Sequence, residues 1–193
     1  RCINFQSPAC INLLPLVTSH AALRVLLADF RQSLIEADEQ VLARPGWAPA
    51  ALAKQMPPML TRFAARLNEL LGEGSGLSAA QADALGALVH AELLPWLSMT
   101  DTADRFYAKP RGYAGDFFTI ERIYQNQSSG SGRLGALLDQ SFLAQPAAVA
   151  VRNRRDLLQG LILDTLQQHG PGPVQVMSLA CGPAAELFDS YAC

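Results

Sequence analysis

The chain has 193 residues, half of them hydrophobic and 17% of them charged, and its formal net charge at pH 7 is −2. This length and composition suffice for a packed core, in one large domain or two small ones, and exclude global disorder. A slightly acidic chain also lacks the clustered positive charge that a broad nucleic-acid-binding surface needs, so we expect no nucleic-acid partner.

Apolar residues recur at helical spacing through most of the first 170 residues. We predict a helix that Ser19 caps and that ends near Ala43, and we expect Pro95 to kink or break the third helix near its end. The segment from Asp101 to Gly132 has the least helical pattern in this part of the chain. The other predicted helices span residues 49–71, 78–97, 116–124, 133–145 and 146–168.

The one strand that the sequence predicts runs from Val174 to Leu179, within the stretch VQVMSLACGPAAELFD. A glycine turn at Gly182 and the opening of a helix follow it, and Pro183 suits the first helical turn. Because a single strand cannot satisfy its own backbone groups, this pattern indicates the beginning of an α/β domain. An ordinary strand-to-helix turn without a ligand is the alternative interpretation.

Cysteine and histidine usage argues against a metal site. Four cysteines lie near the two ends of the chain without CxxC spacing, and the three histidines stand far apart. Zinc ligands occur at close, regular spacing, so we expect no metal. So few cysteines in a chain of this size favour a reducing compartment, and we expect a cytoplasmic protein.

The sequence contains no run that approaches the ~20 apolar residues of a membrane span. Its first residues also lack the charged leader and long apolar region of a signal peptide. The chain starts with Arg1 rather than Met and stops four residues after Asp189, so we expect a fragment of a longer protein.

The segment around Gly182 resembles motif I of class I S-adenosylmethionine-dependent methyltransferases, an acidic residue followed by GxGxG. Ser178 stands at the acidic position, and Ala180, Gly182 and Ala184 stand at the three glycine positions. The sequence therefore keeps one glycine of three, which also counts against a dinucleotide-binding dehydrogenase.

Two upstream segments are more specific. RFYAKPRGYAGDFFTIERIYQNQ (105–127) and AVAVRNRRDLL (148–158) look like the region before motif I in bacterial methyltransferases of 3-hydroxypalmitic acid methyl ester biosynthesis. That family accepts a CGPAxE type of motif I, which residues 181–186 match. The resemblance covers roughly residues 100–190.

The resemblance implies a mainly α chain with a helical cap and substrate-side region over residues 1–170. Residues 171–193 would then be the first strand and glycine turn of a truncated Rossmann-like α/β methyltransferase domain. S-adenosyl-L-methionine is the implied cofactor, with Ser178, Ala180, Cys181, Gly182 and Pro183 as its binding residues. We expect such a fragment to be inactive by itself.

A small or fatty-acid-type carboxylate or hydroxyl is the implied methyl acceptor. A carboxylate is ionised near neutral pH and needs an anchor rather than a base, for which Lys109 and Arg111 are candidates. Tyr113 is a candidate for orienting the acceptor, and Asp116 either caps the next helix or contacts the cofactor. Arg152 either shapes the pocket or pairs with Asp156 on the helix surface. Arg111, Tyr113 and Asp116 are the predicted catalytic residues.

A non-catalytic alternative remains open at this point, namely an all-helical regulatory or interaction module. In either case an unpaired strand favours association, with a second copy or with the remainder of the domain.

Overall fold

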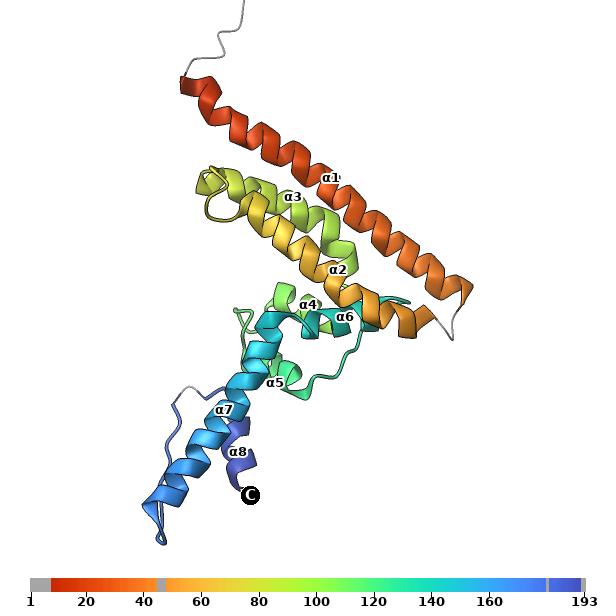
Figure 1. The fold of residues 1–193 in the computed structure, drawn as a ribbon. Helices are drawn as coiled ribbons and strands as arrows, with labels where there is room; N and C mark the ends of the chain where they lie inside the picture. The colour runs from red at the N-terminus through yellow and green to blue at the C-terminus, as the bar shows by residue number, and fades with distance from the viewer. Residues whose placement is uncertain (1–7, 45–47, 180, 192–193) are drawn as a thin grey trace, which may run out of the picture. The chain divides into compact units, whose positions relative to one another are not determined.

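The computed structural model describes residues 8–44, 48–179 and 181–191. Over this part of the chain it is mainly helical, as predicted, and no helix is long and apolar enough to cross a membrane. Eight helices are present in the described residues (Figure 1): α1 (Pro8–Ala43), α2 (Ala48–Leu71), α3 (Ala79–Leu97), α4 (Asp101–Ala108), α5 (Phe117–Gln125), α6 (Gly135–Leu143), α7 (Pro146–His169) and α8 (Ala185–Tyr191).

The contacts within the chain divide it into two compact units. The first contains Arg1–Met99 together with Gly132–Leu134, and the second contains Thr100–Ser131 together with Gly135–Cys193. The helices α1 to α3 therefore belong to the first unit, and α4 to α8 belong to the second.

In the first unit, α1, α2 and α3 pack side by side (Figure 1). Phe30 of α1 stacks on Phe63 of α2 with ring centroids 4.1 Å apart. The buried residues of α1 follow one another at intervals of three or four, which places them on one face of the helix. These residues are Leu23, Leu27, Phe30, Leu34, Ala37 and Val41.

One helix start in this unit differs from its prediction. The expected cap Ser19 lies inside α1, which begins at Pro8. Helix α3 agrees with the predicted range of 78–97, and its start has a capping box of Ser78 and Gln81. Pro95 does not break α3, which runs on to Leu97.

The second unit has a small apolar core where α5, α6 and α7 meet. Ile123, Leu143 and Ala148 are its buried residues, and Phe106 of α4 packs against them with Val151. Helix α4 was not predicted, and its start is held by a hydrogen bond from the Thr102 N–H to the distant Asp139. Thr100 caps this helix, because its hydroxyl oxygen accepts a hydrogen bond from the Ala103 N–H.

A buried carboxylate joins three segments of the second unit. Asp139 of α6 is fully buried, and its two oxygens accept hydrogen bonds of 3.0 Å from the backbone N–H groups of Thr102 and Ser129. Ser129 in turn belongs to the loop next to Gly130, which forms an isolated antiparallel bridge with Thr100. The carboxylate thus ties α4, the loop after α5 and α6 together.

The strand predicted at Val174–Leu179 is absent from the described residues. The chain from Pro173 to Ser178 is irregular and lies along α7, where Val174 and Val176 border the same hollow as Ile162. No described segment is a strand, so the backbone N–H and C=O groups of residues 173–178 have no neighbouring strand with which to form hydrogen bonds. The expected helix after the glycine turn is confirmed as α8.

We expect Asp139→Asn to lower the free energy of unfolding by about 1–3 kcal/mol. The amide would keep one acceptor oxygen but turn an NH₂ donor toward a buried N–H donor. Urea unfolding followed by circular dichroism measures the change. Asp156→Asn, on the exposed side of α7, is the matched control and should change stability by less than about 0.5 kcal/mol. Equal effects of the two substitutions would contradict this role of Asp139.

Candidate functional site

The loop from Lys109 to Asp116 joins α4 to α5 and carries four of the predicted site residues. Lys109 ends α4 in the left-handed conformation (φ 44°), and Gly112 has a φ of 86°. Lys109, Arg111 and Tyr113 are exposed, with Tyr113 58% accessible. The loop therefore presents two cations and a phenol to solvent.

Asp116 lies at the end of this loop and is fully buried. It caps α5 by accepting a hydrogen bond of 3.0 Å from the Thr119 N–H. Both carboxylate oxygens lie 2.8 Å from Nη2 of Arg105, whose Nε also donates to the Thr119 hydroxyl at 3.1 Å. The cap predicted for Asp116 is confirmed, and the ion pair fixes the far end of the loop to α4.

These contacts lower the pKa of Asp116. The hydrogen-bonded guanidinium of Arg105 holds the pKa of Asp116 below its ordinary value of 3.8, and the Thr119 N–H acts in the same direction. Burial of the carboxyl acts the opposite way and is outweighed. Asp116 is therefore a carboxylate at neutral pH, with its negative charge compensated inside the protein.

Arg111 lies on a pair of phenylalanine rings at the start of α5. Its Cζ is 4.4 Å from the centroid of Phe117 and 4.2 Å from that of Phe118, and the two rings stack at 4.1 Å. These are cation–π distances. The contact holds the guanidinium beside the helix although the arginine itself is exposed.

The glycine turn lies beside the same helix start. Gly182 has a φ of 59°, and a Cβ added to it would lie 4.0 Å from Cβ of Phe117. Cys181 and Gly182 are exposed, and Pro183 is half-buried. The structure therefore brings the predicted motif I turn next to the loop that ends at Asp116, and leaves the turn open to solvent.

Among the described residues, the structure gives no contact between the remaining predicted site residues and this loop. Ser178 is exposed, and Ala180 lies outside the described residues. Arg152 forms no ion pair with Asp156 in the described part of the chain. Its Nη1 is buried and has no hydrogen-bond partner there.

Other side chains hold the helices of this unit around the site. Nε of Arg155 on α7 donates to Asp189 of α8 at 2.6 Å, and its guanidinium lies 5.3 Å from the centroid of Tyr124 on α5. Nη2 of the neighbouring Arg154 donates to the Tyr124 hydroxyl at 3.1 Å. The arginines of α7 thus link α5 to α8, which follows the glycine turn.

One comparison with known proteins bears on this unit. Residues 112–192 match the family described as "Putative methyltransferase". The matched region begins in the loop after α4 and includes the glycine turn, and it supports a relationship to methyltransferases. It does not name the 3-hydroxypalmitic acid methyl ester group, so that finer assignment stays a prediction. Neither a curated protein nor a solved structure matches the chain.

Two features beside the candidate site were not predicted from the sequence. Arg105 precedes its partner Asp116 by eleven residues, a separation that no helix or turn rule links. Phe117 and Phe118 were read only as part of a helix, although two adjacent aromatics after a capping Asp cannot both face the core. Their half-exposed state was therefore available from helical geometry.

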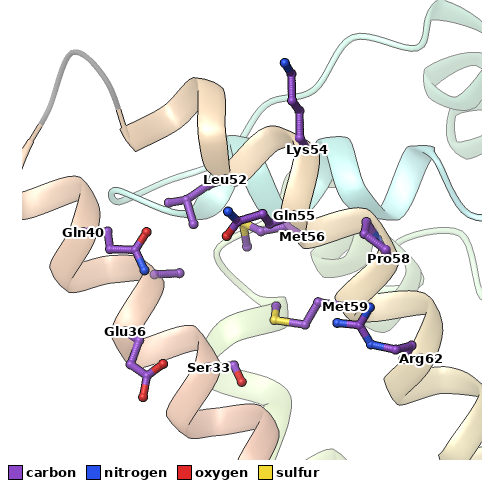
Figure 2. A pocket seen from close by; sticks show the side chains of 11 residues that line it. Ser33, Glu36, Gln40, Leu52, Lys54, Gln55, Met56, Pro58, Met59 and Arg62 are labelled. Atoms are coloured by element: carbon purple, nitrogen blue, oxygen red, sulfur yellow. The ribbon is translucent and has the colours of Figure 1, made fainter.

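One hollow lies outside this region, in the first unit between α1 and α2. Its volume is about 470 Å³, and Figure 2 shows Ser33, Glu36 and Gln40 on one side and Met56, Met59 and Arg62 on the other. Leu52 and Met56 form a buried floor, while the charged side chains at the rim are exposed. None of the predicted site residues lines this hollow.

We expect the stability difference between the wild-type protein and Asp116→Asn to depend on pH. Asparagine still caps α5, so the substitution removes mainly the charge that pairs with Arg105. Because the folded pKa is below 3.8, the charged pair stabilises the protein above about pH 4 and loses this effect as the pH falls through the folded pKa.

Urea midpoints at pH 7, 5 and 3 measure this dependence. The wild-type advantage should be largest at pH 7 and should shrink at pH 3. Asp164→Asn, at an exposed position of α7, is the control with no such trend. A constant difference at all three pH values would mean that the ion pair contributes nothing to stability.

Proposed function

We propose that this chain takes part in methyl transfer from S-adenosyl-L-methionine to a small or fatty-acid-type acceptor, at a carboxylate or a hydroxyl. The observation that carries the proposal is the methyltransferase family match over residues 112–192. The closeness of Gly182 to Phe117 supports it, because it joins the motif I turn to the loop with the candidate acceptor-binding residues.

The glycine turn is suited to hold the donor. A ligand can approach the backbone at Gly182, where no side chain intervenes and the nearest atom to a virtual Cβ is 4.0 Å away. Ser178, Cys181 and Pro183 flank the turn, and Cys181 is a free, exposed thiol. We propose these residues, with Ala180, as the binding residues for S-adenosyl-L-methionine, which supplies an electrophilic methyl group on a cationic sulfur.

The acceptor would bind at the loop from Lys109 to Asp116. A carboxylate is already a nucleophile at neutral pH, so this site has to hold and align it rather than remove a proton. Arg111 and Lys109 supply the positive charge, and the Tyr113 hydroxyl orients one oxygen. The attacking oxygen gains a bond to the methyl carbon as the carbon–sulfur bond breaks, and no proton is transferred.

Asp116 and Arg152 have supporting roles in this proposal. Asp116 is buried and saturated by Arg105 and Thr119, so it acts by fixing the loop rather than by touching the acceptor. Arg152 has a buried nitrogen without a partner among the described residues, and a bound anionic group would satisfy it.

We also propose that residues 171–193 belong to a Rossmann-like domain and that Val174–Leu179 becomes its first strand when other strands are beside it. The apolar side chains of Val176, Met177 and Leu179 are exposed at 45%, 83% and 83%. A strand of a parallel sheet covered on both faces has this composition. The remainder of such a domain, or a second chain, would provide the hydrogen-bonding neighbours.

We expect Gly182→Ala to weaken binding of S-adenosylhomocysteine at least about tenfold. The added methyl group occupies the space through which the ligand approaches the backbone, while its contact with Phe117 is an ordinary one. Calorimetry on the product of the complete reading frame that contains these residues measures the affinity.

Gly170→Ala is the matched control. Gly170 also has a positive φ, 75°, so alanine there is strained as well, but this position lies at the end of α7 rather than in the turn. Binding that is absent in the wild-type protein, or equally weakened by both substitutions, would overturn the donor site.

We expect Arg111→Ala and Tyr113→Phe to reduce methyl transfer about tenfold or more, with little loss of stability, because both side chains are exposed. Methyl transfer from labelled donor to a panel of carboxylic and hydroxy acids measures turnover, and urea unfolding measures stability. A fall in stability as large as the fall in turnover would reduce both residues to structural roles.

A further inference from the structure

The segment from Tyr107 to Phe118 has an unusual composition. It contains two tyrosines, two phenylalanines, one lysine and one arginine, and it lacks leucine, isoleucine, valine and methionine altogether. All four aromatic side chains are partly exposed, Tyr107 at 55%, Tyr113 at 58%, Phe117 at 37% and Phe118 at 40%. The large apolar side chains that this segment offers to a ligand are therefore all aromatic.

Arg111 carries an uncompensated charge in this segment. Arg105 is paired with Asp116, Arg122 lies 3.6 Å from Asp101, and Arg155 is paired with Asp189. Arg111 has no acidic or hydrogen-bonding partner among the described residues. Its guanidinium donors are available to an anion.

The guanidinium of Arg111 is held against two aromatic rings. The Cζ of Arg111 and the centroids of Phe117 and Phe118 form a nearly equilateral triangle with sides of 4.1, 4.2 and 4.4 Å. Both rings belong to the first turn of α5, which the buried Asp116 caps. Three planar groups are thus held together on a rigid helix end, so little ordering is needed when a ligand binds.

We propose that this cluster of Arg111, Phe117 and Phe118 binds a carboxylate carried on a planar ring, so that the acceptor is an aromatic acid. The guanidinium fork matches the carboxylate, and the phenylalanines match the ring by stacked or edge-to-face contacts. A saturated acyl chain would instead call for large aliphatic side chains such as leucine, isoleucine or methionine, which this segment lacks. The inference rests on the proposed function and narrows its acceptor.

Three probes of similar size separate charge from ring shape: benzoate, cyclohexanecarboxylate and benzamide. Titrations followed by NMR of the protein, without donor, give their dissociation constants. We expect benzoate to bind in the millimolar range and about three- to tenfold more tightly than cyclohexanecarboxylate, which lacks ring stacking. Benzamide lacks the charge and should bind at least about tenfold more weakly than benzoate.

Two substitutions test the assigned roles. Arg111→Gln should abolish benzoate binding, and Phe118→Leu should bring benzoate and cyclohexanecarboxylate to equal affinity. Arg24→Gln, at an exposed arginine of α1, is the matched control and should change neither. Urea unfolding of each variant excludes loss of fold as the cause.

Equal binding of the two carboxylates by the wild-type protein, or no binding of benzoate, would overturn this inference. If the protein still bound S-adenosylhomocysteine in that case, the proposed function would stand, because affinity for the donor site at Gly182 is measured in a separate experiment. Benzoate binding without S-adenosylhomocysteine binding would support the acid-binding cluster but overturn the proposed function. The protein would then bind an aromatic acid without using this methyl donor.

Discussion

The ion pair between Arg105 and Asp116 is the interaction on which the candidate site depends. It is buried on the side of Asp116, it caps α5 and it anchors that helix to α4, so both ends of the loop from Lys109 to Asp116 are fixed. The exposed groups of the loop are then displayed from a constrained backbone. Removing one partner would leave a buried charge unpaired, which is far more costly than losing an exposed ion pair.

The second unit contains a constrained region around α5 and an exposed region around Gly182. Around α5, charged and aromatic groups are satisfied by neighbours on α4 and α7, whereas the turn at Gly182 and the chain before it expose backbone and apolar side chains. The proposed acceptor-binding residues lie in the constrained region, and the backbone that the proposed donor would approach lies in the exposed region. This division is compatible with a donor and an acceptor that bind at adjacent places.

The sequence predicted most helices because their signals are local. The capping pattern at Ser78, the proline at the start of α7 and the Asp116 cap each act within one turn, and all three are present. The failures have non-local causes: α4 depends on Asp139 from a distant helix, and the segment Val174–Leu179 lacks the neighbours that define a strand. The residues of the loop could be selected from their chemistry, but the partner of Asp116 required the fold.

The chain from Gly170 to Ala185 contains no lysine, arginine, aspartate or glutamate. Charged residues and prolines normally keep extended apolar backbone from joining identical copies, and here only Pro171, Pro173 and Pro183 can do so. The solubility of the protein at high concentration therefore depends on what covers these residues. Ligands or polypeptide that order this stretch should act as solubilising agents, and their removal should favour precipitation.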